Sequence, residues 1–226
     1  MRRLTPYTLH TGKLSRPLRF AVVSDLHDES YQDILPMLQG ADALLVPGDI
    51  TNRYRGTWDR GLEFLRDASR LLPTFFSLGN HETRQRSFRA LVEQLEQTGA
   101  EVLVNRYVPF GECFIGGWYD PQVVREPDML DAFEALPGCK VLLCHKPNHY
   151  LQYMRQRKLD LVVSGHAHGG QIRLLGRGLY APDQLFFPKY TRGIVDGRMI
   201  ISAGAGNPVR IPRWNNPPEV LMVTLD

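Results

Sequence analysis

The chain has 226 residues, of which 43% are hydrophobic and 23% are charged, and its formal net charge is +3. These values are typical of a globular protein with one sizeable core, and they argue against a disordered or fibrous chain. A charge excess this small, with no concentrated basic stripe, also argues against non-specific nucleic-acid binding. We therefore predict a globular domain with no specific nucleic-acid partner.

Cysteine usage points to a reducing compartment. Cys113, Cys139 and Cys144 form no Cys-x-x-Cys pair, and each lies in an apolar stretch. They are expected to be reduced, buried thiols. Residues 1–20 are basic but lack the apolar segment of a signal peptide, and no uncharged run approaches the length of a bilayer span. We expect a cytoplasmic protein, with peripheral membrane or lipid contact left open.

After a polar arm at residues 1–17, short apolar runs alternate with amphipathic segments, and we expect one domain over residues 18–226. The apolar runs predict strands at residues 18–24, 43–47, 74–78, 140–144 and 159–164. The amphipathic segments predict helices at residues 30–39, 57–72, 84–98, 127–136 and 148–157. Such alternation is typical of βαβ units around a largely parallel sheet.

Two regions interrupt this alternation. Residues 100–119 are expected to form two strands joined by a Pro/Gly turn, and from residue 170 onward the chain shows strands and turns without a helix. Within that last part, residues 194–202 predict a hairpin with an Asp-Gly turn. Residues 219–225 predict a closing strand. The whole pattern indicates a mixed α/β sandwich with helices on the outside.

Metal-capable side chains follow each of the five predicted parallel strands. In chain order they are Asp25 and His27, then Asp49, then Asn80, His81 and Glu82, then His145, and last His166 and His168. Ligands of α/β sheets bind beyond the carboxyl ends of the strands. Each residue alone has an ordinary explanation, such as a helix cap for an aspartate or a turn for an asparagine. Their occurrence together at five strand ends indicates a metal or catalytic site.

The chemistry of these side chains narrows the choice of metal. Carboxylates, imidazoles and one amide oxygen, without a thiolate, suit Mn, Fe, Zn, Co or Ni rather than Ca. So many candidate ligands are too many for one ion, and they fit two ions that share a carboxylate. We expect two divalent ions, with manganese favoured. His10 and His149 stay outside this set as ordinary structural residues.

These motifs resemble the five blocks of the calcineurin-like metallophosphoesterase superfamily, in the usual order. The blocks are Asp25-x-His27, Gly48-Asp49, Gly79-Asn80-His81-Glu82, His145 and Gly165-His166-Ala167-His168. The stretches "GHAHGGQIR", "GLYAPDQLFFPKYTRG" and "IPRWNNPPEV" further resemble the bacterial YaeI/YkuE-type phosphodiesterase branch. The resemblance implies a four-layer αββα sandwich, with two mixed β-sheets flanked by helices.

The resemblance also implies a role for each residue. Asp25, His27 and His168 would hold one ion, Asn80, His145 and His166 would hold the second, and Asp49 would bridge both. A hydroxide between the ions would attack phosphorus, so the expected activity is hydrolysis of a phosphodiester or phosphomonoester. His81 would donate to the leaving-group oxygen, with Asn80 and Asp49 beside it in the catalytic set. Glu82 would either orient a neighbouring residue or cap a helix.

Alternatives remain for the substrate. One is a lipid-linked substrate, of the UDP-diacylglucosamine or phospholipid type, and another is a non-catalytic metal-site interaction module. Residues 185–190 form either a lipid-facing lip or, as we favour, part of the core. Gly165, Gly169 and Gly170 are expected to keep backbone near the metals free of Cβ atoms that would crowd the substrate. The candidate phosphate contacts are all basic: Arg53, Arg55, Lys146, Lys189, Arg192, Arg210 and Arg213.

Overall fold

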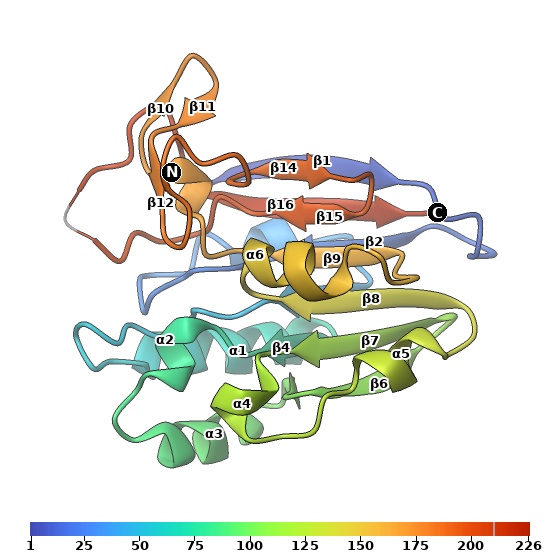
Figure 1. Ribbon diagram of the computed structural model, residues 1–226. Coiled ribbons are helices and arrows are strands. Elements are labelled where there is room, and N and C mark those ends of the chain that lie inside the picture. Colours follow the sequence, from blue (N-terminus) through green and yellow to red (C-terminus); the bar gives the residue numbers. More distant parts are fainter. Residues whose placement is uncertain (210) are drawn as a thin grey trace.

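The computed structural model describes residues 1–209 and 211–226, and two six-stranded sheets lie at its centre (Figure 1). The first sheet has the order β1 (Arg3–Leu9), β16 (Glu219–Leu225), β2 (Leu18–Val22), β3 (Ala43–Val46), β4 (Thr74–Ser77) and β5 (Glu101–Leu103). The second has the order β14 (Gly193–Val195), β15 (Met199–Ile201), β9 (Leu161–Ser164), β8 (Cys139–Cys144), β7 (Cys113–Trp118) and β6 (Arg106–Phe110). Each sheet combines a run of parallel strands with antiparallel pairs near its edges, so both sheets are mixed.

Three apolar clusters separate four layers. Between the sheets, Phe20 and Leu45 of the first sheet share one cluster with Val141 and Leu143 of the second. The outer face of the first sheet packs against α1 (Asp59–Leu71) and α3 (Phe88–Glu96). The outer face of the second sheet packs against α5 (Leu130–Glu134) and the π-helical turn at Tyr150–Met154. The predicted αββα sandwich is therefore confirmed.

The five predicted parallel strands are all present as β2, β3, β4, β8 and β9. The sequence of each strand is a continuous apolar run because the strand is covered on one face by the other sheet and on the opposite face by helices. The predicted hairpin is formed by β14 and β15, and its turn residues Asp196 and Gly197 have φ of 51° and 69°. Such positive φ values are what a tight Asp-Gly hairpin turn requires.

The helices depart further from prediction. α1 and α3 lie within the predicted ranges, but residues 30–39 form only the 3₁₀ turn Leu35–Leu38, which begins next to Pro36. Residues 148–157 divide into the short α6 (Pro147–His149) and the π-helical turn. Two four-residue helices, α2 (Asn80–Thr83) and α4 (Pro121–Val124), were not predicted. A single turn is too short to show hydrophobic periodicity.

Residues 1–17 are not an arm outside the domain. β1 pairs in parallel with β16 along its whole length, from Arg3 opposite Glu219 to Leu9 opposite Leu225. An edge strand with one exposed face carries polar residues, which is why the sequence suggested an arm. Residues 100–119 likewise contain three strands rather than two, because β5 joins the first sheet while β6 and β7 form a hairpin in the second.

The segment between β9 and β14 lies beside the carboxyl ends of the parallel strands. It contains the 3₁₀ turn His168–Gly170 and two small hairpins, β10 (Arg173–Leu174) with β11 (Arg177–Gly178) and β12 (Tyr180–Ala181) with β13 (Leu185–Phe186). Figure 1 shows this segment, in orange, at the end of the sandwich where α2 and α6 also lie. Among the described residues, no helix is long and apolar enough to cross a membrane.

Candidate metal centre

The residues that follow the five parallel strands meet at one end of the sandwich, where the carboxyl ends of both sheets lie side by side. Ligand atoms of three residue groups lie within 4.8 Å of one another, and all these residues are buried. The Nε2 atom of His145 also lies 3.2 Å from Oδ1 of Asn80. The three groups are Asp25 with His27 and His168, His27 with Asp49 and His81, and Asp49 with His145 and His166. The first group contains the three residues expected to hold one ion, and the third contains His145 and His166 of the other expected set together with Asp49, the expected bridge.

The backbone of this centre is strained. Most non-glycine residues avoid positive φ, because the left-handed region costs them about 1–2 kcal/mol. Five of the candidate ligands lie in that region: Asp25 (55°), His27 (53°), Asp49 (57°), His166 (68°) and His168 (46°). Hydrogen bonds between the loops hold these conformations, including those from Asp25 N to Gly48 O (3.1 Å) and from His27 N to Asp49 O (3.0 Å). Strain concentrated in this way is typical of functional sites.

Neighbouring carbonyl groups orient two of the imidazole rings. Nδ1 of His145 lies 2.8 Å from the Pro47 oxygen, and Nδ1 of His27 lies 3.3 Å from the Thr51 oxygen. A carbonyl oxygen only accepts hydrogen bonds, so each Nδ1 carries a proton and Nε2 is the ring atom left to bind a metal. Those Nε2 atoms face the centre, where that of His145 lies 3.1 Å from Oδ2 of Asp49. This is the usual support of histidines that bind metals.

Asp183 orients a third ring and was not singled out from the sequence. Its Oδ2 lies 3.1 Å from Nε2 of His166 and 2.8 Å from Nζ of Lys146. The hydrogen bond from His166 is the main reason why the pKa of Asp183 is lowered. With Nε2 engaged, His166 has Nδ1 available toward the centre. Asp183 follows no core strand, so the rule that predicted the other site residues could not find it.

Burial sets the charge states of the centre. It raises the pKa of Asp25 to about 6, with a further contribution from Asp49. It also lowers the pKa of His27 and of His168 well below the ordinary value, so both rings are neutral and each has a nitrogen that can bind a metal. The pKa of His145 is raised to about 9, because the attraction of Asp49 outweighs the burial. Two buried carboxylates beside the neutral rings of His27 and His168 suit a divalent cation, which would take the place of the proton that Asp49 stabilises on His145 in the metal-free centre.

His81 lies against this centre. Its backbone N donates to Oδ1 of Asp49 (2.7 Å), and its Nδ1 accepts from the backbone N of Arg53 (3.3 Å). Burial lowers the pKa of His81, so the ring is predominantly neutral. Because Nδ1 is an acceptor, the proton of the neutral ring lies on Nε2. The ring can therefore donate a hydrogen bond from Nε2.

Glu82 combines both roles considered for it. Its carboxylate is fully buried and accepts hydrogen bonds from the backbone N of Gly79 (2.7 Å) and of Asp49 (2.7 Å). It also accepts from the backbone N and the hydroxyl of Thr51, both at 3.0 Å. Burial raises the pKa of Glu82 to about 7. Glu82 thus caps α2 and at the same time ties α2 to the loop that carries Asp49.

The glycines near the histidines are explained by packing within the protein. A Cβ at Gly169, where φ is +62°, would lie 2.2 Å from Oδ1 of Asn216. At Gly170 it would lie 2.3 Å from the Cα of Gly178, and at Gly165 it would lie 1.9 Å from the Ser24 hydroxyl. The expectation that these glycines make room for substrate was therefore wrong. They allow the histidine loop to pack against its neighbours.

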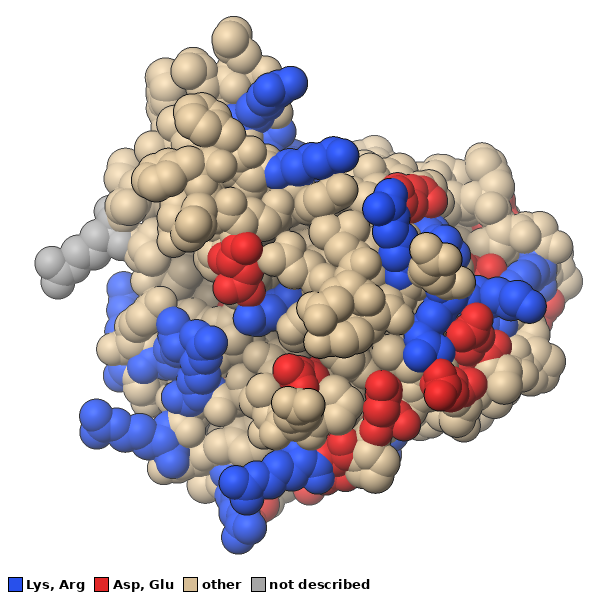
Figure 2. Space-filling view, in the orientation of Figure 1, with Lys and Arg blue, Asp and Glu red and all other residues tan. Residues whose placement is uncertain are grey.

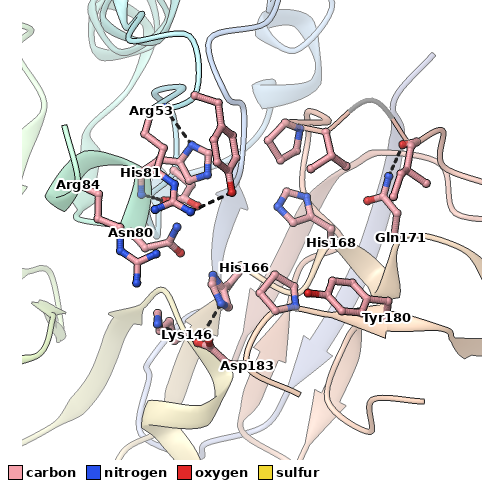
Figure 3. Close-up of a pocket in the computed structure, with 16 residues that line it drawn as sticks. Arg53, Asn80, His81, Arg84, Lys146, His166, His168, Gln171, Tyr180 and Asp183 are labelled. Atoms are coloured by element: carbon pink, nitrogen blue, oxygen red, sulfur yellow. Dashed lines mark hydrogen bonds and ion pairs between the residues drawn. The ribbon is translucent and has the colours of Figure 1, made fainter. Parts of the chain in front are cut away.

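A pocket opens over the centre, and Figure 3 shows its lining. Asp49, Asn80, His81, His166 and His168 lie at its base. One side of the wall carries the cationic Arg53, Arg84 and Lys146, of which Lys146 is paired with Asp183. The other side is largely apolar and is formed by Tyr180, Pro182, Pro208, Val209 and Ile211, while Tyr54 and Gln171 complete the lining. The pocket therefore offers a phosphate-attracting rim on one side and an apolar surface on the other.

The basic residues expected to contact phosphate have different positions. Arg53 and Lys146 line the pocket, and Arg55 lines an adjoining groove. Nη2 of Arg213 lies 3.2 Å from Nδ1 of His168. The remaining three are Arg192, which is paired with Glu219, Lys189, whose Nζ lies 5.3 Å from the ring centroid of Tyr190, and Arg210, which lies outside the described residues.

The segment at residues 185–190 is mostly exposed. Leu185, Phe186 and Phe187 are 62%, 76% and 75% exposed, so the expectation that they belong to the core was wrong. Leu185 and Phe186 form β13 of the small hairpin with β12, and Phe187 follows directly after it. Phe186 pairs there with Tyr180 of the pocket wall. Leu185, Phe186 and Phe187, which we call the apolar lip, therefore adjoin the pocket.

Comparisons with known proteins agree on one protein family. Residues 18–170 match the family model described as calcineurin-like phosphoesterase. An uncharacterized metallophosphoesterase of Campylobacter jejuni is 27% identical over 85% of this chain and 55% of its own length. Phosphodiesterase YaeI of Escherichia coli is 26% identical over 92% of this chain and 82% of its own length. The chain thus spans about half the length of the Campylobacter protein.

One solved structure adds support for the fold. The 5′-nucleotidase precursor of Thermus thermophilus superposes with a TM-score of 0.50 and 16% identity, over 71% of this chain and 43% of its own. At this level of identity, the similarity concerns the architecture alone.

Proposed function

The chain belongs to the calcineurin-like phosphoesterase family, and from this premise we propose that it hydrolyses a phosphodiester or phosphomonoester at a centre of two divalent metal ions. One observation carries the proposal. Seven oxygen and nitrogen donors from five strand ends are gathered at one end of the sandwich, and each of these residues is at most 7% exposed. Buried carboxylates at this density are costly without a cation.

In this proposal Asp25, His27 and His168 hold one ion, and Asn80, His145 and His166 hold the other. Asp49 lies between the two sets, since it belongs to groups with both His27 and His145. When bound, two such ions would supply a nucleophilic hydroxide at neutral pH and neutralise charge on the phosphoryl group. Manganese is the metal we favour among those that suit an oxygen and nitrogen donor set without a thiolate.

His81 is proposed as the donor to the leaving-group oxygen. Its Nδ1 is occupied by the N–H of Arg53, so Nε2 presents the proton. A correctly placed proton donor contributes about 10²–10⁴ in rate. Lys146 and the guanidinium group of Arg53, on the pocket wall, would attract the phosphate as it enters.

A parallel assay tests the proposal. The protein is stripped of metal and loaded with Mn²⁺, and hydrolysis of bis-p-nitrophenyl phosphate and of p-nitrophenyl phosphate is measured with metal content on the same sample. We expect about two ions per chain and hydrolysis of at least one ester. An Asp25→Asn variant, loaded in the same way, is the control for contaminating phosphatases. A protein that binds two ions and cleaves neither ester would instead be a non-catalytic interaction module.

A lipid-linked substrate is the second candidate, and the apolar lip favours it. Large exposed apolar clusters usually mark an interaction site. Here the lip adjoins the apolar side of the pocket, so an acyl chain could lie there while its phosphate reaches the metals. Activity on UDP-diacylglucosamine in detergent micelles, compared with activity on the soluble esters, separates this candidate from the first. A preference for the soluble esters would contradict it.

Two finer assignments complete the proposal. Placement in the YaeI/YkuE-type phosphodiesterase branch is supported by the similarity to phosphodiesterase YaeI, and it predicts that the diester is the better substrate. A cytoplasmic location is supported by the three free, buried cysteines Cys113, Cys139 and Cys144. Subcellular fractionation tests the location, and recovery outside the cytoplasmic fraction would overturn it.

A further inference from the structure

A second groove adjoins the metal pocket and is lined by arginines. Arg53, Arg55, Arg84 and Arg86 line it together with the aromatic rings of Tyr54 and Trp58, and no carboxylate lines it. Arg53, Tyr54 and Arg84 line both cavities, so the groove lies directly beside the pocket over the metal centre. Figure 2 shows Lys and Arg side chains gathered on the side where α2 and the loop before α1 lie.

These four arginines lack acidic partners in the part of the chain that the structure describes. No ion pair among the described residues includes any of them, whereas Arg2, Arg155, Arg157 and Arg192 all pair with carboxylates. The Nε atom of Arg53 is buried without a hydrogen-bond partner, and its guanidinium group lies 4.7 Å from the Tyr54 ring centroid. Like charges held close together repel one another, so this arrangement is stabilised when an anion enters.

The loop that carries Arg53 and Arg55 is pre-organised. Oδ1 of the buried Asn52 accepts from the backbone N of Tyr54 (3.1 Å) and of Arg55 (3.3 Å). Asn52 and Thr57 close the loop with two backbone hydrogen bonds, of 2.9 and 3.2 Å. The loop is tied to the reacting centre, because the N–H of Arg53 donates to His81. The position of the groove relative to His81 is therefore fixed.

From these contacts we infer that the arginine groove binds a second phosphate group of the substrate, separate from the phosphate that is cleaved. Guanidinium groups match phosphate oxygens geometrically and remain charged. The substrate class is then an ester with at least two phosphate groups, one at the metal centre and one between Arg55, Arg84 and Arg86. This inference rests on the proposed function for the first phosphate and extends it to the rest of the substrate.

Binding to the metal-free protein tests the groove by itself. Calorimetry with inorganic pyrophosphate, in the presence of a chelator, compares the wild type with the double variant Arg55→Gln/Arg86→Gln. The control is Arg60→Gln/Arg89→Gln, which removes the same charge from exposed positions outside the groove. We expect the groove variant to bind at least tenfold more weakly and the control to bind within about twofold of wild type. Equal affinity in all three proteins would overturn the inference.

Competition in the Mn²⁺-loaded enzyme tests the link to the substrate. Adenosine 3′,5′-bisphosphate and adenosine 5′-monophosphate are compared as inhibitors of bis-p-nitrophenyl phosphate hydrolysis. In the wild type and the control, the bisphosphate should inhibit about tenfold more strongly than the monophosphate, and the groove variant should lose this difference. The same preference in both double variants would contradict the inference. If the loaded enzyme cleaves no ester, the proposed function fails, while the calorimetry still decides the groove.

Discussion

The base of the pocket and the segment that borders it, residues 171–192, differ in almost every physical respect. At the base, the candidate ligands are at most 7% exposed, and they follow strands that are buried on both faces. The bordering segment consists of two-residue strands and turns, and its apolar lip is up to 76% exposed. The difference suggests a division of labour in which the sheets hold the chemistry and the bordering segment selects the substrate.

Packing explains why the chemistry is located at the base. The strands that precede the ligands belong to clusters that hold both sheets together, so a ligand can be held in a strained conformation by its surroundings. The small hairpins have no comparable core. Their side chains can change without disturbing the metal centre, as is usual for loops on a rigid scaffold.

The largest effect is expected from Asp25→Asn, at the base. Losing one anionic ligand should lower hydrolysis at least 10²–10³-fold and reduce bound metal from two ions to one. The metal-free variant should be more stable than the wild type by about 1 kcal/mol, because a buried carboxylate with a raised pKa is removed. Metal analysis and calorimetry on the same sample measure both effects. Two retained ions would show that Asp25 is not a ligand.

His81→Ala tests whether His81 donates a proton to the leaving group or binds a metal ion. The second role is considered because His81 lies with His27 and Asp49 in one of the three groups that could hold a metal. The turnover number should fall about 10²–10⁴-fold. The metal content should stay at two ions per chain, because Asp49 and His27 have other partners. Metal analysis beside kinetics distinguishes the two roles. Loss of metal together with activity would make His81 a ligand.

Glu82→Gln tests how the base is supported. The new amide would place N–H groups against backbone donors that now point at a carboxylate, which should cost about 1–3 kcal/mol of stability. Metal affinity should fall about 10–100-fold, as is usual when residues behind metal ligands are changed. Glu96→Gln at an exposed position is the control and should shift stability by less than about 0.5 kcal/mol. Equal metal affinity in both variants would show that Glu82 does not support the metal ligands.

Phe186→Ser/Phe187→Ser tests the apolar lip. Both side chains are exposed, so stability should change by less than about 0.5 kcal/mol. Binding to vesicles that contain an anionic phospholipid should weaken at least tenfold, because each buried aromatic side chain contributes about 1.5–3 kcal/mol. Sedimentation with vesicles measures the change. If the wild-type protein does not bind vesicles at all, the lipid-linked substrate is contradicted and the soluble ester is favoured.

The smallest effect is expected from His149, which packs beside Trp118 and Tyr153 rather than at the centre. Burial lowers the pKa of His149 to about 4. The folded state thus favours the neutral ring, and the stability present above the unfolded pKa of about 6.5 is lost as the pH falls toward 4. His149→Gln should reduce the decline in melting temperature between pH 7 and pH 5. An unchanged decline would mean that other histidines cause it.

Local patterns were sufficient for the five central parallel strands and for naming the candidate ligands that follow them. Strands buried on both faces leave long apolar runs, and the polar residues that follow them are visible in the chain itself. The short helices and Asp183 could not be found in this way. A single helical turn has no measurable periodicity, and Asp183 reaches His166 from a turn that follows no core strand.

By itself, the sequence determined the strand order along the chain, the donor chemistry and the family of motifs, because each depends on residues close together in the chain. Only the tertiary structure decided that β1 completes the first sheet, that Phe186 and Phe187 are exposed and that Arg55 and Arg86 line one groove. These features depend on contacts between distant segments. Whether an apolar or basic side chain is covered is set by what packs against it, and no local pattern encodes that.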